Sequence, residues 1–241
     1  MRRHLPRLRQ IAVRPTASYT HHTPPKTDSS HIVEQPHTTT TSNTNHAKPN
    51  KTAFYQRPLP PNLARFDAPE NRQRFIQAVA NGTAEAYFPL AQQFTTQTEP
   101  AFCGPSCLAM ILNTLRIDPN TIWKGGWRWF DERTIVSSCC KPLDVIETEG
   151  ITLDEFASLG RCHGAAVELC RPVDGSSTAA DEPGTEAHFR STLIASCSSK
   201  EAPFMIVSFL RTALGQTGTG HFSPVAAYHR ETDSALILDI A

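Results

Sequence analysis

The chain has 241 residues, 39% of them hydrophobic, and its 23 basic and 23 acidic residues give a formal net charge of zero. This length suits one sizeable domain, or one domain and a tail, and zero net charge lacks the basic field that a nucleic-acid partner requires. No apolar stretch approaches the ~20 residues needed to cross a bilayer, so composition predicts neither a nucleic-acid partner nor a membrane protein.

Residues 1–50 are rich in Thr, His, Pro, Ser and Asn and show no hydrophobic period. Such a segment buries too little apolar surface to offset its ordering entropy, so we expect a disordered tail. Five arginines precede the first acidic residue, Asp28, a pattern that also suits an organelle transit peptide. The folded catalytic domain is then expected over residues 51–241.

Hydrophobic periodicity predicts mostly helices in the first half of the folded part and strands in the second. Helices are expected at 69–80, 104–115, 143–150, 153–164 and 186–199. Strands are expected at 165–171 and 203–210, with two more, joined by a polar turn, in 222–241. Helices followed by an antiparallel sheet indicate an α+β fold.

Cys103 stands at the start of the helix predicted at 104–115, in the segment QTEPAFCGPSC. Unpaired N–H groups and the positive end of the helix dipole favour a thiolate there, which lowers the pKa of a cysteine. The position therefore favours a nucleophile. The alternative is a buried core cysteine without chemistry, since cysteine is among the most buried residue types.

A cysteine nucleophile needs a base and a group that orients the base. His221 begins the first strand of the C-terminal hairpin, and Asp239 lies near the end of the second. The hairpin is expected to bring them to the same end of neighbouring strands, where the imidazole would partner an acid embedded in apolar residues. The alternative is a turn histidine and a strand-end cap.

Gln97 precedes the cysteine by six positions. Its amide N–H and the Cys103 backbone N–H could together stabilise the oxyanion of an acyl-transfer intermediate. The order of glutamine, cysteine on a helix, then histidine and acid on a sheet is the order of papain-like enzymes.

Four segments, QTEPAFCG, LNTLRIDPNTIWKGGWRWFDE, QTGTGHFSPVAAY and DSALILDIA, resemble the phytochelatin synthase family. The resemblance runs from about Phe54 to Ala241 and implies a papain-like fold. It also implies Cys103 as nucleophile, His221 as base, Asp239 as orienting acid and Gln97 as oxyanion donor.

The resemblance implies a glutathione γ-glutamylcysteinyltransferase that makes phytochelatins through a γ-Glu-Cys acyl-enzyme on Cys103 and releases glycine, in heavy-metal detoxification. No cofactor is obligatory, and cadmium and zinc would activate as thiolate complexes of glutathione. Two alternatives stay open: a glutathione hydrolase, and a metal-binding protein without catalysis. The second would use the seven cysteines, although these are sparse for a storage protein.

Cys139, Cys140 and Cys162, with His163 beside them, are expected to form a soft-metal patch, or else to be buried thiols. The aromatic run from Trp123 to Phe130 is expected to pack in the core and loops, or to line a substrate cleft.

Members of the family usually continue past the final strand, beginning with an arginine, so the catalytic domain is expected to be truncated at its C-terminal end. A homodimer stays open. The absence of an apolar signal core in MRRHLPRLRQIAV favours a cytoplasmic location, and its arginines offer mitochondrion or plastid as the alternative.

Overall fold

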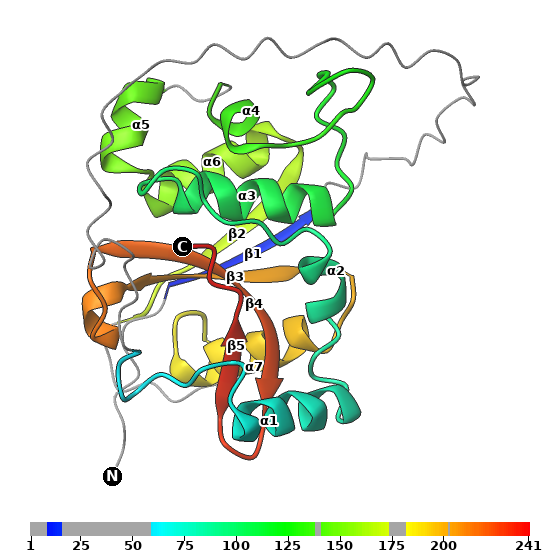
Figure 1. Cartoon of the computed structure of the whole chain (residues 1–241), viewed down its shortest axis with the longest axis vertical. Coiled ribbons are helices and arrows are strands. Elements are labelled where there is room, and N and C mark those ends of the chain that lie inside the picture. The colour runs from blue at the N-terminus through cyan, green and yellow to red at the C-terminus, as the bar shows by residue number, and fades with distance from the viewer. Residues whose placement is uncertain (1–8, 16–58, 138–140, 174–181, 202) are drawn as a thin grey trace, which may run out of the picture.

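The computed structural model describes residues 9–15, 59–137, 141–173, 182–201 and 203–241, which form an antiparallel sheet between two helical layers (Figure 1). The strands, in the spatial order β2-β1-β3-β4-β5, are β1 (Arg9–Pro15), β2 (Ala165–Cys170), β3 (Phe204–Leu210), β4 (Gly220–His229) and β5 (Ser234–Ile237). The helices are α1 (Pro69–Ala80), α2 (Tyr87–Ala91), α3 (Cys103–Thr114), α4 (Glu132–Ser137), α5 (Leu143–Glu149), α6 (Leu153–Cys162), α7 (Glu186–Cys197) and the 3₁₀ turn η1 (Arg211–Leu214). The predicted α+β class is confirmed.

The long helices begin and end close to the predicted residues because their terminal signals are local. Pro69 lies in the first turn of α1, where a missing N–H costs nothing. Thr152 and Glu155 form a reciprocal capping box at the start of α6. The Thr152 N–H donates to the Glu155 carboxylate over 2.6 Å, and the Glu155 N–H donates to the Thr152 hydroxyl over 3.3 Å.

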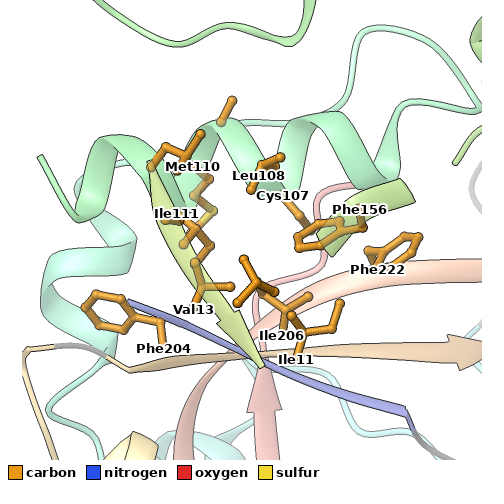
Figure 2. Close-up of a cluster of buried hydrophobic side chains, with 14 of the residues drawn as sticks. Ile11, Val13, Cys107, Leu108, Met110, Ile111, Phe156, Phe204, Ile206 and Phe222 are labelled. Carbon is orange, nitrogen blue, oxygen red and sulfur yellow. The ribbon is translucent and has the colours of Figure 1, made fainter. Parts of the chain in front are cut away.

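The main core lies between the sheet and the layer formed by α3 and α6 (Figure 2). Residues 104–112 of α3 are all buried, so this helix is buried nearly all round and not along one stripe alone. On the opposite face of the sheet, α7 packs Leu193 and Cys197 against Met205, Val207 and Val225. In the described ranges, no helix is long and apolar enough to cross a membrane.

Strand β1 corrects the prediction that residues 1–50 form a disordered tail, because residues 9–15 of that segment form an interior strand of the sheet, between β2 and β3. Ile11 and Val13 are fully buried beneath α3. Two apolar side chains in alternation within a polar, arginine-rich segment are too weak a signal for a strand, which is why the sequence pattern missed it. Residues 1–8 and 16–50 lie outside the described residues.

Helices α2 and α4 were not predicted, because they have only five and six residues, too few for a helical period to appear in the sequence. The predicted C-terminal hairpin is confirmed as β4 and β5, which pair in antiparallel register with a bulge between Val225 and Ala227. Strand β5 ends at Ile237, so Asp239 lies two residues beyond it and not within it.

Candidate active site

Cys103 is the first residue of α3, as the sequence predicted, and its side chain is half-buried. The packing around residue 104 explains why a glycine follows Cys103. A Cβ on Gly104 would lie 2.4 Å from Cγ1 and 2.6 Å from Cδ1 of Ile151, closer than side chains approach. Glycine therefore lets the start of α3 pack directly against the segment that enters α6.

His221 lies on β4, and its Nε2 is 2.7 Å from Oδ1 of Asp239. The prediction that the hairpin brings these two side chains together is confirmed. His221 is buried, with its ring edge-on to Phe209 at a centroid distance of 5.5 Å. The next residue, Phe222, stacks on Phe156 of α6 at 5.0 Å, which fixes this part of β4 under the helical layer.

The His221 side chain and the backbone of Phe222 and Gly104 favour the charged form of the Cys103 thiol. Burial alone would raise the pKa of the thiol, but these groups outweigh burial and lower the pKa below its usual value. These surroundings therefore shift the Cys103 thiol toward its charged form.

The pKa of His221 is raised, whereas that of Cys103 is lowered. Burial would lower the pKa of His221, but its hydrogen bond to Asp239, its interaction with Cys103 and the charge of Asp239 raise the pKa above the usual value. Burial likewise opposes the shift at Asp239, whose pKa is nevertheless lowered, chiefly by the hydrogen bond from His221. The pKa shifts of Cys103, His221 and Asp239 thus all act toward the charged form of each group.

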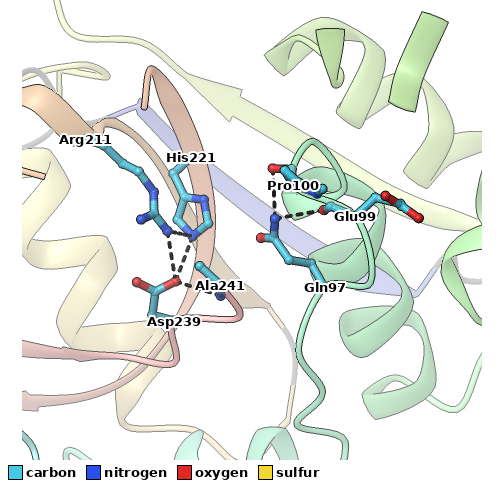
Figure 3. Close-up of polar contacts among 7 residues, drawn as sticks. All are labelled: Gln97, Glu99, Pro100, Arg211, His221, Asp239 and Ala241. Carbon is cyan, nitrogen blue, oxygen red and sulfur yellow. Dashed lines mark hydrogen bonds and ion pairs between the residues drawn. The ribbon is translucent and has the colours of Figure 1, made fainter. Parts of the chain in front are cut away.

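Arg211, at the start of η1, belongs to this cluster and was missed by the sequence analysis (Figure 3). Its Nη2 lies 3.0 Å from Nε2 of His221 and 3.5 Å from Oδ1 of Asp239. An imidazole N–H that donates to Asp239 cannot also accept from a guanidinium, so we assign the favourable contact of Arg211 to the carboxylate. Its charge opposes protonation of His221. The available signal was an arginine directly after a buried strand, ten residues before the histidine.

Gln97 lies in the loop before α3, and its backbone N–H donates to the carbonyl of Ile240 over 2.8 Å. Its side-chain Nε2 donates to the carbonyls of Glu99 and Pro100, each over 2.9 Å (Figure 3). Its Oε1 is buried without a hydrogen-bond partner among the described residues. Both side-chain amide hydrogens of Gln97 are therefore already donated to these two carbonyls. To donate to an oxyanion, the Gln97 amide would have to break one of these two bonds. The oxyanion role stays a prediction.

Glu132 of α4 is a second residue that the sequence analysis missed. It is buried, and its Oε1 accepts from the Thr98 backbone N–H over 3.0 Å. The hydroxyls of Thr98 and Ser106 also donate to its carboxylate. Since Thr98 follows Gln97 and Ser106 lies one turn after Cys103, this single carboxylate joins the Gln97 loop to the helix that carries the thiol.

The other thiols differ from Cys103. Cys107 packs in the core, where burial raises the pKa of its thiol well above the usual value. Cys162 is exposed at the end of α6, whereas Cys139 and Cys140 lie outside the described residues. Within the parts of the chain that the structure describes, no three His, Cys, Asp or Glu side chains are grouped to hold a metal ion. The metal patch stays a prediction.

The tryptophans do not pack in the core. Trp123, Trp127 and Trp129 are 40%, 76% and 42% exposed, whereas Phe130 is buried as expected. Trp123 is held at the surface by a 2.8 Å hydrogen bond from its Nε1 to Asp131 and by the ammonium of Lys124, 4.5 Å from its ring centroid.

Comparison with known proteins shows the family of the chain. Residues 54–241 match the family model described as phytochelatin synthase. The chain is 45% identical over 188 residues to glutathione gamma-glutamylcysteinyltransferase 3 of Lotus japonicus, covering 78% of this chain and 37% of that protein. It is 44% identical over 191 residues to glutathione gamma-glutamylcysteinyltransferase of Schizosaccharomyces pombe, covering 79% and 43%. The chain thus spans less than half the length of these relatives.

Proposed function

Because the chain belongs to the phytochelatin synthase family, we propose that it is a glutathione γ-glutamylcysteinyltransferase in which Cys103 is the nucleophile. The observation that carries the proposal is the 2.7 Å hydrogen bond between His221 and Asp239, together with the position of Cys103 at the start of α3, where His221 lowers the pKa of its thiol. A thiolate paired with an imidazolium, itself oriented by a carboxylate, is the arrangement that nucleophilic acyl transfer requires.

In the first step, Sγ of Cys103 attacks the carbonyl carbon of the Cys–Gly amide of glutathione. The amide C–N bond breaks, and His221 transfers its proton to the amine of the departing glycine. The product is a thioester between Cys103 and γ-Glu-Cys. Because Nε2 of His221 faces Asp239, the other ring nitrogen, Nδ1, is left for this proton transfer.

In the second step, the α-amine of another glutathione attacks the thioester and His221 accepts the proton. This forms a new amide bond and restores Cys103, giving (γ-Glu-Cys)2-Gly and, by repetition, longer phytochelatins. Water attacking the same thioester would give γ-Glu-Cys, so hydrolysis differs from transfer only in the acceptor.

The proposal extends to the fold and to metals. A nucleophile at the start of a buried helix, with the base on an antiparallel sheet and the acid just after its last strand, supports a papain-like arrangement. We propose that cadmium and zinc enter as thiolate complexes of the glutathione substrate, within a pathway of heavy-metal detoxification.

The test is mass spectrometry of the purified protein incubated with glutathione, with and without cadmium. We expect a γ-Glu-Cys adduct on the Cys103 peptide and (γ-Glu-Cys)2-Gly in solution. An adduct with only γ-Glu-Cys and glycine in solution would establish a hydrolase. Turnover without an adduct, or turnover by Cys103→Ala, would refute the assignment.

A matched control separates loss of the nucleophile from loss of any thiol. Cys170, on β2, is a half-buried cysteine away from His221, and burial raises the pKa of its thiol. We expect Cys170→Ala to keep the adduct and the product, and Cys103→Ala to lose both while its circular dichroism spectrum is unchanged.

A further inference from the structure

A cavity lies on the face of the sheet opposite to α3, between α7 and the hairpin of β4 and β5 (Figure 1). Its volume is about 120 Å³. Folded interiors contain few voids larger than a water molecule, so a hollow of this size is unusual among close-packed side chains. Cys103, His221 and Asp239 are not among the described residues that line it, so the cavity is separate from the candidate active site.

The inner wall of the cavity is apolar. Leu193 of α7, Val207 of β3 and Val225 of β4 form it, and all three are buried. Phe189 and Ile237, which are half-buried, extend this wall toward the surface. An apolar cavity of similar size, about 150 Å³, stays dry and binds benzene or xenon. The wall therefore selects an apolar occupant.

The outer end of the cavity has a polar rim, formed by Arg190, Asp233 and Tyr228. Arg190 donates from Nε to Oδ1 of Asp233 over 3.1 Å and from Nη2 to Oδ2 over 2.7 Å. The Tyr228 hydroxyl donates to the same Oδ1 over 2.5 Å. The Arg190 and Asp233 side chains are 34% and 52% exposed, whereas Tyr228 is buried, so the ion pair marks the end of the cavity that faces solvent.

The charges at the polar rim disfavour a charged ligand. Nη2 of Arg190 also donates to Glu186 over 2.9 Å, so one guanidinium is shared by two carboxylates. The hydrogen bonds from Arg190 and Tyr228 lower the pKa of Asp233 below its usual value, which keeps this carboxylate charged at neutral pH. An anion would be repelled by the surplus carboxylate, and a cation would have to compete with Arg190 for its partners.

We infer that this cavity is a binding site for an uncharged, ring-sized apolar molecule, which enters past the Arg190–Asp233 ion pair. Removing the ring from water supplies the binding free energy, and the volume of the cavity limits the ligand to about one ring. A bound molecule would contact β4, which carries His221, and β5, which precedes Asp239, without entering the candidate active site.

The experiment uses the full chain with ¹³C-labelled methyl groups of Ile, Leu and Val, and benzene as the probe. We expect benzene to shift the signals of the methyl groups that line the cavity, those of Leu193, Val207, Val225 and Ile237. Leu108, in the core beneath α3, should keep its signals, and the Tm should rise with the benzene concentration. Benzoate, the same ring with a negative charge, should cause neither change. Unmoved cavity methyl signals with benzene, or equal shifts with benzoate, would overturn the inference.

Three substitutions by phenylalanine provide the variants and their control. Val207→Phe fills the cavity from its inner wall, and Ala235→Phe fills it from its exposed end. Val79→Phe makes the matched change at an exposed position of α1. We expect the first two variants to lose the methyl shifts and the rise in Tm with benzene, and Val79→Phe to keep both.

The Ala235→Phe variant decides the question even where Val207→Phe does not fold, because position 235 is exposed. Methyl shifts of parent size in Ala235→Phe would refute the site, since the probe would then bind elsewhere. These readouts do not depend on glutathione, so they stand apart from any failure of the proposed enzymatic function.

Discussion

The backbone N–H of Gln97 donates to the carbonyl oxygen of Ile240 over 2.8 Å. This bond ties the loop that precedes the nucleophile helix to the segment that carries Asp239. The Ile240 side chain is fully buried in the core beneath α3. A residue with no chemical function of its own therefore connects the predicted oxyanion donor to the segment of the acid that is predicted to orient the histidine.

Ile240→Ala should weaken both the fold and the site. Truncating a buried isoleucine costs about 2–5 kcal/mol of the free energy of unfolding, and the resulting cavity loosens the Gln97 loop. We expect a lower denaturation midpoint and slower glycine release. The same truncation at Ile122, which is 69% exposed, should change neither measurement. Equal behaviour of the two variants would contradict the positioning role of Ile240.

Gly104→Ala should displace the start of α3, because the added Cβ would meet the side chain of Ile151. Such overpacking costs about 1–3 kcal/mol and moves the thiol relative to His221. The measurement is the denaturation midpoint together with the rate of glycine release. Gly126→Ala is the control, since nothing lies within 4 Å of a Cβ at that position. Restoring activity with Ile151→Ala in the Gly104→Ala background would confirm the clash, and failure to restore it would argue against this cause.

Glu132→Ala should release the Gln97 loop from α3, because the Thr98 N–H and the Ser106 hydroxyl lose their common acceptor. An orphaned buried donor costs about 1–3 kcal/mol, and misplacement of the site by about 1 Å can slow turnover ~10²-fold. Glu132→Gln keeps one acceptor oxygen, so an intermediate rate is expected. Glu147→Gln, on the exposed face of α5, should have the parent rate. Parent activity in Glu132→Ala would exclude Glu132 as a positioning residue.

The pH dependence of Cys103 alkylation should report the thiolate–imidazolium pair. Since the pKa of Cys103 is lowered, iodoacetamide should modify it at pH values below the usual thiol range, with the rate falling as the pH drops through that lowered pKa. In His221→Gln the same half-maximum should move to higher pH, because burial then acts without the imidazolium. Glycine release should also fall at high pH, as His221 loses its proton above its raised pKa. An unchanged alkylation profile in His221→Gln would show that the pair does not form.

The sequence predicted the parts of this molecule that depend on local signals. Hydrophobic periods and end signals located α1, α3, α6 and the terminal hairpin, and the hairpin geometry placed His221 beside Asp239. The sequence did not predict the site contacts of Arg211 and Glu132, because both side chains bond to residues far away along the chain, and no local pattern encodes such contacts. Strand β1 was missed because its apolar alternation is a weak local signal, and the partners that stabilise it are more than 140 residues away along the chain.

That separation has a consequence for the synthesis of the chain. Strand β1 leaves the ribosome first, but one of its two partners, β3, begins at Phe204. At translation rates of ~5–20 residues per second, the strand waits about 10 to 40 s before that partner has been made. During this interval the sheet cannot close, and the surface of α3 that Ile11 and Val13 later cover stays open to solvent. Folding of this protein is thus expected to be largely post-translational, and its nascent chains should depend on chaperones more than the size of the domain suggests.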